Sequence, residues 1–422
     1  MDGTKRILLT LIPAGLLGFP CMLQADTIVG GPIDADTVWE AEKSPYLVTL
    51  NVAVSEDVTL TIEPNVVVKF TANRCLQVSG CLLAQGTETE PIVFTSDDDI
   101  PDGNGQPGDW GYVEFTETAQ DAQYDPDGKY VSGCIMEYCQ LRYGGGLEKG
   151  MLRLLNASPY VHNCIIEKSG NSGVYAYDDG CDNAWISSCQ ITGNSTPHYD
   201  VHGGGVYCAY SKPRFTECSI NNNNCEDRGA GIYCYYSGPI FEDCCIIGNH
   251  LTGGGYGQGS AIYIYAGVDN PTIRRCCIMG NTTASGQGCA ILLEGHPTIE
   301  FCHIAGNDGY AVENYNSAGW GDHELGNNYW GSCDALAIRM LIYDWYHDNG
   351  RGKIDFYPYM CDFDDSWQVD FYDYAFFAWE WLNTGMNVSD LNGDYVVYWK
   401  DLGFFASYWL WRSPCSGCSI PP

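Results

Sequence analysis

The segment GPIFEDCCIIGN at residues 238–249 contains the pattern that decides the fold. The pattern returns as NPTIRRCCIMGN at residues 270–281 and as HPTIEFCHIAGN at residues 296–307. Earlier copies read SPYVHNCIIEKSG from Ser158 and KPRFTECSINNNN from Lys212. The last three intervals between the prolines of consecutive copies are 26, 32 and 26 residues. Similarity that recurs at such a spacing is the signature of a repeat array.

Each copy carries the same residue types at fixed distances after its proline. An apolar residue follows after two positions, a cysteine after five and an isoleucine after seven. The cysteines are Cys164, Cys218, Cys244, Cys276 and Cys302, and the isoleucines are Ile166, Ile220, Ile246, Ile278 and Ile304. A cysteine and an isoleucine two residues apart point to the same face of a β-strand. The odd step before the cysteine requires a bend, and the Gly-Asn pairs of several copies suit left-handed turns.

A period near 26 residues with several short strands per unit predicts one coil of a parallel β-helix. One coil cannot bury its inner face alone, whereas coils stacked about 4.8 Å apart share one core. A β-propeller needs about 40 residues or more per unit. Short β-rich runs between Ile28 and Phe115 extend the array toward the N-terminus. We expect roughly eleven or twelve coils, with the repeated cysteines and isoleucines in two inward files.

The net charge and the N-terminal segment indicate which partners are disfavoured and where the protein is located. The 422 residues include 53 acids and 20 bases, for a net charge of -33. This balance argues against nucleic acid and against anionic membrane surfaces as partners. Lys5 and Arg6 precede an apolar run from Ile7 to Gly18, and Ala25 follows, which is typical of a signal peptide over residues 1–25. No later apolar run is long enough to form a transmembrane segment, so we expect a secreted protein.

The 22 cysteines allow three interpretations. Stacked cysteines lie within bridging range, but their parallel side chains disfavour the dihedral angle that a disulfide needs. Metal binding is disfavoured, because no histidine or second cysteine stands at the spacing of a tetrahedral site. We therefore favour a buried ladder of free thiols. Cys415 and Cys418 form a single C-x-x-C pair, for which a tail disulfide or free thiols are favoured over zinc.

The N-terminal part and the end of the array resemble known proteins. DTVWEAEKSPYLVTLNVAVSEDVTLTIEPNVVVKF from Asp36, followed by PIVFTS and PGDWGYVEF, resembles the opening of secreted bacterial right-handed parallel β-helix proteins. GNNYWGS from Gly326 and GKIDFYPYM from Gly352 look like their closing segment. The resemblance implies an all-β right-handed solenoid over residues 26–360. It does not imply an activity, because this architecture hosts lyases, hydrolases, adhesins and surface proteins.

The C-terminal segment is an internal duplication. DFDDSWQVDFYDYAFFAWEWL from Asp362 aligns with DLNGDYVVYWKDLGFFASYWL from Asp390 at an offset of 28 residues. The duplicated loop and helix resemble a dockerin type I module of the kind found at the ends of exported planctomycete-type proteins. The resemblance implies a small α-helical module of paired EF-hand-like loops over residues 361–412, with a tail over residues 413–422. It also implies a cohesin-like or other surface protein as partner.

The spacing of oxygen-bearing side chains in the duplication predicts two calcium sites. An EF-hand-type loop supplies ligands at positions 1, 3, 5, 9 and 12 and a backbone carbonyl at 7. The first loop offers Asp362, Asp364, Ser366, Asp370 and Asp373 with the carbonyl of Gln368, and the second offers Asp390, Asn392, Asp394 and Asp401 with the carbonyl of Val396. Position 6, normally glycine, holds Trp367 and Tyr395. If that position needs a positive φ, each aromatic residue costs about 1–3 kcal/mol, so we expect reduced affinity.

The array offers few candidates for catalysis. Glu226, Asp227 and Arg228 form the one cluster of two acids and a base before a glycine-led strand, and a surface ion pair is the competing interpretation. The acids at 97–99 and 178–179 stand in turn-like segments and are expected to be solvated. Neither a nucleophile motif nor a phosphate-binding loop occurs in the sequence.

Tyrosines near strand ends are the other candidate surface. They are Tyr207, Tyr210, Tyr233, Tyr235, Tyr236, Tyr263 and Tyr265. Tyrosines two residues apart share a face and should stack across coils. Such a ladder either binds the flat faces of sugar rings or only stabilises the outer sheet.

The sequence thus favours a secreted or cell-surface scaffold that binds extracellular polysaccharide and attaches through a calcium-dependent module. The alternative is a polysaccharide lyase or glycoside hydrolase that acts in polysaccharide breakdown. The scarcity of converging acids and bases favours the scaffold over the enzyme. The partner positions in a dockerin, just after position 9, hold Phe371-Tyr372 and Trp399-Lys400. These residues differ from the small polar pairs of cohesin binders, so a different partner, or packing on the β-helix, is also open.

Overall fold

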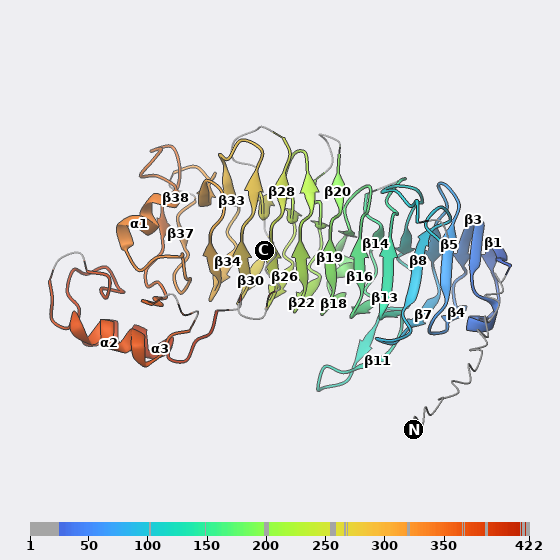
Figure 1. Cartoon of the computed structure of the whole chain (residues 1–422), viewed down its shortest axis with the longest axis horizontal. Helices are drawn as coiled ribbons and strands as arrows, with labels where there is room; N and C mark the ends of the chain where they lie inside the picture. Colours follow the sequence, from blue (N-terminus) through green and yellow to red (C-terminus); the bar gives the residue numbers. More distant parts are fainter. Residues whose placement is uncertain are drawn as a thin grey trace, which may run out of the picture.

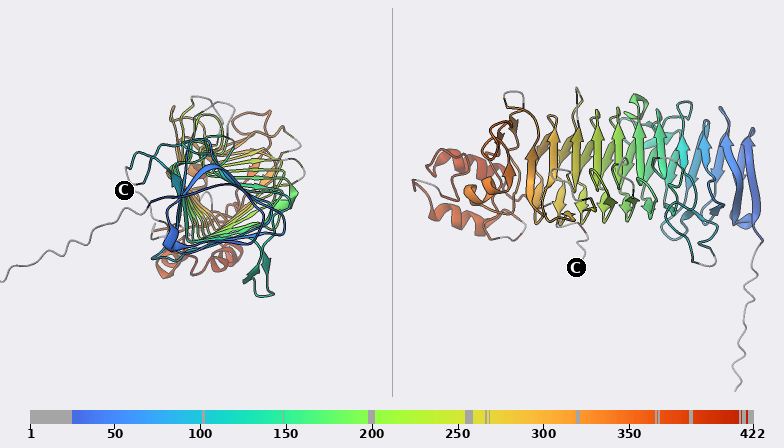
Figure 2. Two further views of the ribbon diagram at one scale, coloured as in Figure 1. Left: turned by 90° about the vertical axis from the view of Figure 1, so that its right-hand side faces the viewer. Right: turned by 90° about the horizontal axis from the view of Figure 1, so that it is seen from above.

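The chain forms a long solenoid with a small helical module at its C-terminal end (Figure 1). The computed structural model describes residues 25–100, 103–147, 149–197, 202–253, 259–265, 267, 269–318, 321–364, 366, 368–384, 387–413, 415 and 418. The predicted signal peptide falls on residues 1–25 and lies almost wholly outside the described residues. Seen along the axis, the strands of successive coils superpose (Figure 2), and their inward side chains form one hydrophobic core. The fold is the expected mostly-β parallel helix.

Each regular coil contributes a strand to three stacked faces. The first face contains β3 (Tyr46–Val54), β6 (Leu76–Val78), β9 (Val113–Phe115), β14 (Leu152–Leu155), β17 (Val174–Tyr177), β21 (Val206–Ala209), β25 (Ile232–Tyr235), β29 (Ile262–Tyr265), β33 (Cys289–Glu294), β36 (Tyr310–Asn314) and β38 (Ile342–Tyr343). The second contains β5 (Val67–Phe70), β8 (Ile92–Ser96), β13 (Cys139–Arg142), β16 (Ile165–Glu167), β19 (Gln190–Thr192), β23 (Ser219–Asn221), β27 (Cys245–Ile247), β31 (Cys277–Met279) and β35 (His303–Ala305). The third contains β2 (Thr37–Trp39), β4 (Thr59–Ile62), β7 (Cys81–Gln85), β12 (Ile135–Glu137), β15 (Tyr160–His162), β18 (Trp185–Ser187), β22 (Arg214–Thr216), β26 (Ile240–Glu242), β30 (Thr272–Arg274) and β34 (Thr298–Glu300).

Shorter elements complete the chain. β1 (Thr27–Ile33) pairs in parallel with β3 and opens the solenoid. A short fourth face consists of β20 (Ser195–Thr196), β24 (Asn224–Cys225), β28 (His250–Leu251) and β32 (Thr282–Thr283). The remaining strands are the antiparallel β10 (Gln123–Tyr124) and β11 (Tyr130–Ser132) and the parallel β37 (His323–Glu324) and β39 (Ile354–Asp355). The helices are α1 (Ala335–Met340), α2 (Phe371–Trp379) and α3 (Trp399–Ser407), with 3-10 turns η1 (Ala41–Lys43) and η2 (Asp179–Cys181).

The repeat predicts the core correctly. All five repeat cysteines and all five repeat isoleucines are buried, and Ile220, Ile246, Ile278 and Ile304 pair in register from coil to coil. The cysteines form the expected ladder of free thiols, which Cys139 and Cys189 join. The bend before each cysteine is a left-handed residue, for example Asp243 at φ 55° and Arg275 at φ 52°.

The asparagine of the Gly-Asn pairs has a role that the turn argument does not cover. The glycine takes the left-handed conformation, as at Gly248 with φ 65°. The asparagine is buried, and the side-chain amide of Asn223 donates to Asn249 Oδ1 at 3.0 Å. Asn249 donates in turn to Asn281 at 2.9 Å. This amide ladder satisfies polar groups that a solenoid corner would otherwise bury unpaired.

The C-terminal module packs against the end of the β-helix. Its core residues Phe377 and Phe405 belong to the same hydrophobic cluster as Trp330 of the β-helix. The chain then runs back alongside the solenoid (Figure 1), where Cys415 is bonded to Cys277 and Cys418 to Cys245. A third disulfide joins Cys333 to Cys361 at the start of the module. The tail cysteines are therefore bridged, each to a β-helix cysteine.

Candidate functional site

Four outward-facing tyrosines on the first face are packed rather than exposed. Tyr175, Tyr207, Tyr233 and Tyr263 stand in register on β17, β21, β25 and β29, and each is less than one-tenth exposed. Consecutive rings lie 5.0 to 5.3 Å apart. Burial raises the pKa of each of Tyr207, Tyr233 and Tyr263. This file stabilises the sheet, so one part of the predicted tyrosine ladder is structural.

A second group of tyrosines on the same face is accessible, and we call it the tyrosine strip. It consists of Tyr177, Tyr210, Tyr235, Tyr236 and Tyr265. Tyr177, Tyr210 and Tyr236 are 39%, 46% and 38% exposed. The rings of Tyr210 and Tyr236 are parallel with centroids 5.9 Å apart, and Tyr235 and Tyr265 stack at 5.4 Å. Parallel, half-exposed rings at this spacing form a surface suited to sugar faces.

Two residues of the tyrosine strip have a left-handed backbone conformation. Tyr210 and Tyr236 have φ 54° and 45°, in the left-handed region. The equivalent turn positions of the two preceding coils hold Asn156 and Asp178, with φ 55° and 75°. Asparagine and aspartate tolerate this conformation, whereas an aromatic residue there is strained by about 1–3 kcal/mol. Aromatic residues outside the strip share this conformation, for example Tyr138, Tyr143 and Phe301 with φ 48°, 66° and 57°, so the exposure of the rings and not the strain distinguishes the tyrosine strip.

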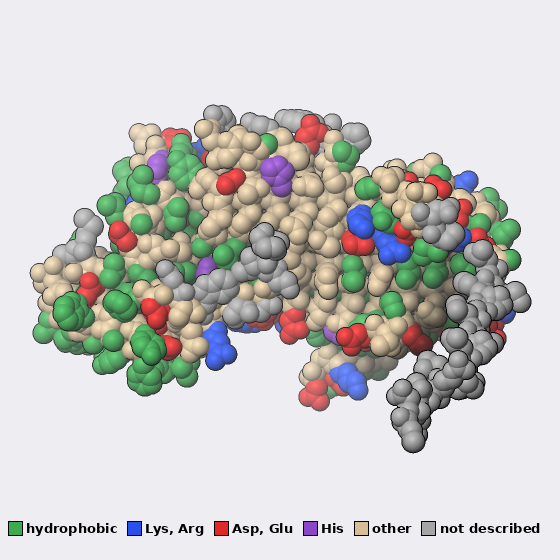
Figure 3. Space-filling view, in the orientation of Figure 1, with side chains coloured by type: hydrophobic (Ala, Val, Ile, Leu, Met, Phe, Trp, Pro, Cys, Tyr) green, Lys and Arg blue, Asp and Glu red, His purple; other side chains and the backbone are tan. Residues whose placement is uncertain are grey.

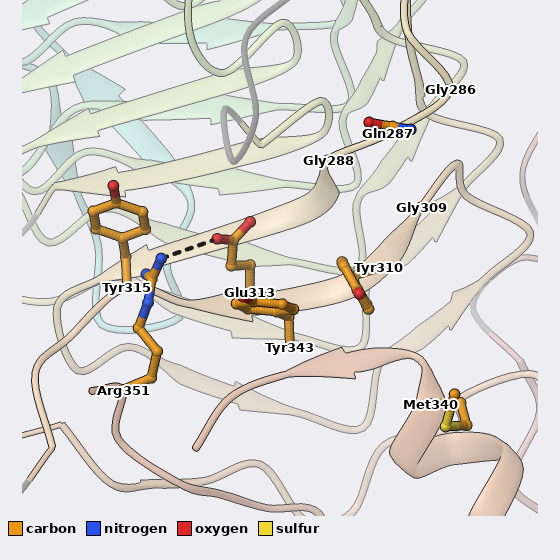
Figure 4. Close-up of a pocket in the computed structure, with 10 residues that line it drawn as sticks. All are labelled: Gly286, Gln287, Gly288, Gly309, Tyr310, Glu313, Tyr315, Met340, Tyr343 and Arg351. Carbon is orange, nitrogen blue, oxygen red and sulfur yellow. Dashed lines mark ion pairs between the residues drawn. The ribbon is translucent and has the colours of Figure 1, made fainter. Parts of the chain in front are cut away.

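A cavity of about 650 Å³ lies beside the C-terminal end of the first face (Figure 4). Its walls include Tyr310 and Glu313 of β36, Tyr343 of β38, Met340 of α1 and Arg351 from the segment before β39. Gly286, Gln287, Gly288, Gly309 and Tyr315 complete the lining. Cavities of this size, with aromatic walls and a few polar groups, are typical of ligand-binding sites.

Glu313 and Arg351 supply the charges of this cavity. Their closest atoms, Arg351 Nη2 and Glu313 Oε1, are 3.6 Å apart. The guanidinium lies 3.8 Å from the centroid of the Tyr315 ring and donates to the carbonyl of Asn314 at 3.2 Å. Burial raises the pKa of the Glu313 carboxyl, while Arg351 opposes the rise. No sequence motif marks these residues, and the one signal is a glutamate at an outward position where the two preceding coils hold Tyr263 and Leu292.

The predicted Glu226–Arg228 cluster is assembled around a buried carboxylate. Asp227 is buried, with its oxygen 3.2 Å from His202 Nδ1 and 3.7 Å from Arg228 Nε. The Arg228 guanidinium lies 5.2 Å from the centroid of the Tyr263 ring. Tyr263 donates a hydrogen bond to Glu294 at 2.6 Å. The structure thus brings Asp227 and Arg228 together with a histidine that sequence reasoning missed.

The acids at 97–99 and 178–179 do not join this cluster. Asp99 accepts hydrogen bonds from Thr95 at 2.7 Å and from Arg142 at 2.8 Å and is buried. The expectation of a solvated loop was therefore wrong for Asp99, because Arg142 neutralises it. Asp178 and Asp179 are exposed, as expected, and Asp178 caps the 3-10 turn η2.

The first acidic loop brings Asp362, Asp364 and Asp373 together, with one oxygen of each within 4.8 Å of the others. Asp373 accepts backbone N–H bonds from Phe363 at 2.6 Å and from Asp370 at 2.7 Å. The remaining predicted ligands form hydrogen bonds within the loop and at the start of α2. Asp370 caps α2 by accepting from Tyr372 N, and the Ser366 hydroxyl donates to the Gln368 carbonyl at 3.0 Å.

The second acidic loop repeats this arrangement with Asp390, Asp394 and Asp401. Asn392 Oδ1 accepts from Asp394 N at 2.9 Å, and the Tyr398 hydroxyl donates to Asp394 at 2.8 Å. Tyr395 at position 6 has φ 68°, so this position does need the left-handed conformation. The strain expected of an aromatic residue there is present in the loop.

The residues present fit a calcium ion in both loops. Carboxylate and amide oxygens are the ligands that calcium prefers. Burial is the main cause that raises the pKa of Asp373, Asp390 and Asp401, and neighbouring carboxylates add to it. A bound cation would relieve this repulsion. When bound, calcium would cross-link the start of each loop to the helix that follows it.

The helices of the module expose hydrophobic side chains (Figure 3). Phe371, Tyr372 and Trp399, which occupy the predicted partner positions, are 75%, 72% and 68% exposed. Lys400 beside Trp399 is exposed as well. Packing of the module on the β-helix therefore leaves this surface accessible.

Comparisons with known proteins agree with the solenoid. Residues 131–329 match a family described as right handed beta helix region. Residues 31–210 match a family described as pectate-lyase like beta helix domain. No helix among the described residues is long and apolar enough to cross a membrane.

Two individual proteins are similar over limited stretches or at low identity. Protein bark beetle of Drosophila melanogaster is 32% identical over 108 residues, which are 23% of this chain and 3% of that protein. The chain therefore spans a small part of this relative. A solved structure, ORF18 of Geobacillus virus E2, is 12% identical, with a TM-score of 0.31. The matched region covers 77% of this chain and 56% of the ORF18 chain.

Proposed function

We propose that this right-handed β-helix repeat protein is a secreted or cell-surface scaffold that binds extracellular polysaccharide on its first face. The tyrosine strip carries the proposal, because it places accessible aromatic rings side by side on successive coils of one face. Accessible aromatic rings in a row offer apolar contact area for the flat faces of sugar rings.

The C-terminal module is proposed to bind calcium and to attach the scaffold to a cohesin-like or other surface protein. The two clusters of three carboxylates support calcium, and the exposed Phe371, Tyr372 and Trp399 support a protein partner. Three disulfides among the described residues support an oxidising, extracellular location. The net charge of -33 supports partners other than nucleic acid.

Affinity electrophoresis of the full chain in gels that contain soluble polysaccharides tests the binding proposal. The double variant Tyr210→Asn, Tyr236→Asn removes two rings but places a residue that tolerates a positive φ at each turn. Its fold should therefore persist while retardation is lost. The matched control is Tyr138→Asn, because Tyr138 also has a positive φ, 48°, but lies between β12 and β13. Equal retardation of the double variant and the control would contradict the proposal.

The second candidate function is a polysaccharide lyase or glycoside hydrolase, and the Asp227 cluster favours it. A carboxylate with a histidine 3.2 Å and a guanidinium 3.7 Å from its oxygen could serve acid–base chemistry. The match to a pectate-lyase like domain also favours it. The assay measures release of new reducing ends and absorbance of unsaturated products from polysaccharides. If the wild-type protein shows such activity and Asp227→Asn and Arg228→Gln lose it, the enzyme proposal replaces the scaffold proposal.

A further inference from the structure

The tyrosine strip leads into the cavity at the end of the first face. By strand register, Tyr177 aligns with Ala209, then with Tyr235, Tyr265 and Glu294. Tyr315 is the next residue of this file, because it follows the pair Leu293–Asn314. Tyr315 is half exposed and lines the cavity. A ligand that lies along the strip toward the C-terminus therefore reaches the cavity.

The cavity closes this path. Arg351 lies over the Tyr315 ring at 3.8 Å, and Tyr343 of β38 stands in register beyond Glu313. Met340 of α1 forms a further wall (Figure 4). These three residues come from the segment that ends the solenoid. At the other end, the file continues from Tyr177 to Leu155, which is only partly buried. The path is thus blocked at one end and continues along the solenoid at the other.

The chemistry at the blocked end suits hydroxyl groups. The closest atoms of Glu313 and Arg351 are 3.6 Å apart, beyond a direct hydrogen bond, so both keep capacity for a ligand. Tyr310 and Tyr343 supply aromatic walls beside them. The terminal sugar of a chain carries a hydroxyl where an internal sugar carries a glycosidic bond. A carboxylate and a guanidinium at the end of the path can bind that hydroxyl.

The charges favour a neutral sugar. Arg351 is the one cation among the cavity residues and already faces Glu313, and its Nε donates to Asp348 at 3.4 Å. These three groups sum to one negative charge, and the whole chain carries -33. An anionic sugar would meet an unfavourable field at this site.

We infer that the cavity binds the terminal residue of a neutral glycan whose following residues lie on the tyrosine strip, so that the protein binds polysaccharide at chain ends. This inference rests on the proposed polysaccharide binding and adds the substrate class and the mode of attachment. A surface that binds internal segments would need a path open at both ends.

The experiment tests whether binding capacity follows the number of polysaccharide chain ends or the mass of polysaccharide. Full-length protein is titrated with cellulose-, xylan-, mannan- and laminarin-derived oligosaccharides and with the soluble parent polymers before and after partial acid hydrolysis. Chain-end binding predicts that the capacity per gram of polymer rises in proportion to the number of ends. Oligosaccharides blocked at the terminus that enters the cavity, by reduction to the alditol at one end or by benzylidene protection at the other, should lose affinity.

Variants connect the effect to the cavity. Glu313→Gln removes the charged acceptor with little change of shape, and affinity for unblocked oligosaccharides should fall about tenfold to a hundredfold. The control is Glu300→Gln, because Glu300 is also paired with an arginine, Arg274, but lies on the third face. The thermal transition of each variant verifies that it is folded. The polymer titrations use the wild-type protein, so they test the inference even if a variant fails to fold.

The outcomes separate the two proposals. If no neutral polymer or oligosaccharide binds, the proposed function and this inference both fail. If polymers bind with a capacity that follows mass and not the number of ends, polysaccharide binding stands and the chain-end inference is overturned. Unchanged affinity in Glu313→Gln would likewise overturn it.

Discussion

Cys415 of the C-terminal tail is bonded to Cys277 of β31, across a sequence separation of 138 residues. Cys418 is bonded to Cys245 of the neighbouring strand β27. Cys245 and Cys277 are themselves paired in register on the two strands. Two adjacent coils therefore hold one short tail. His303 of the next coil adds a hydrogen bond to Ser413 at 2.7 Å. The module is tied to the solenoid at both of its ends, since Cys333–Cys361 fixes its start.

Peptide mapping without reduction should recover Cys277–Cys415 and Cys245–Cys418 as linked pairs. The double variant Cys277→Ser, Cys245→Ser frees the tail, and the module should become sensitive to limited proteolysis. In the chain-entropy description, closing a loop of this length contributes about 4–5 kcal/mol. Cys225→Ser, which removes a buried thiol that forms no disulfide, is the control. Recovery of a Cys415–Cys418 bridge would contradict this arrangement.

The inward isoleucine file should not tolerate charge. Ile246 is fully buried between Ile220 and Ile278 in register. Ile246→Asp places an unpaired carboxylate in this core, and the protein should fail to fold. Ile246→Val removes one methylene group and should cost about 0.5–1.5 kcal/mol. Urea unfolding followed by circular dichroism measures both, and a folded Ile246→Asp variant would refute the register.

Calcium should stabilise the module within the full chain. The intact protein is the appropriate sample, because the module shares its core with the β-helix. Calcium at about 100 times its Kd should add about 2.7 kcal/mol to the stability of each loop that binds it. The readouts are isothermal titration with calcium and the thermal transition in calcium compared with EDTA.

Single substitutions assign the calcium effect to the loops. Asp364→Asn and Asp394→Asn remove one exposed carboxylate from each cluster and keep its shape. Each variant should lose about tenfold or more in affinity at one site. Asp57→Asn, in an exposed turn near the start of the solenoid, should leave calcium binding unchanged. If millimolar calcium produces no shift in the wild-type protein, only the fold of the module persists.

A buried histidine should make stability depend on pH. Burial, assisted by His296, lowers the pKa of His323 to about 4. Its Nε2 accepts a hydrogen bond from the Asn316 amide at 3.1 Å, which protonation would break. The unfolded chain takes up a proton near pH 6.5 but the folded chain does not, so stability falls as pH falls from about 6.5 to 4. The loss is on the order of 3 kcal/mol.

The variant His323→Gln tests this dependence. It removes the titrating group but keeps a polar side chain that can accept from Asn316. The difference in melting temperature between pH 7 and pH 4.5 should shrink in this variant. His250→Gln, a histidine bonded to Thr282 on the short fourth face, should leave the difference in place. An equal pH dependence in His323→Gln and the wild type would exclude the histidine as its cause.

Part of the candidate site was predictable and part was not. The spacing of Asp390, Asp394 and Asp401 predicts their convergence, because a loop of this length folds back on itself locally. Tyr210, Tyr235, Tyr236 and Tyr265 of the tyrosine strip were predicted only as part of a larger ladder, and Tyr177 was not predicted. The alternation of side chains cannot distinguish the packed Tyr233 from the accessible Tyr235, because both face outward. Side chains from other segments decide which tyrosines stay accessible, because Lys149, His202 and Arg228 lie against Tyr207, Tyr233 and Tyr263 of the packed file.

The sequence by itself determined the solenoid. The repeat copies share a cysteine, an isoleucine and a left-handed turn residue at fixed spacing. Each copy therefore packs against neighbours with the same pattern, and the stacked copies stabilise one another. The tertiary structure alone decided the cavity between Glu313 and Arg351 and the partners of Cys415 and Cys418. These contacts join segments far apart in the chain and occur once. A contact that occurs once leaves no period in the sequence, and only the folded chain brings its residues together.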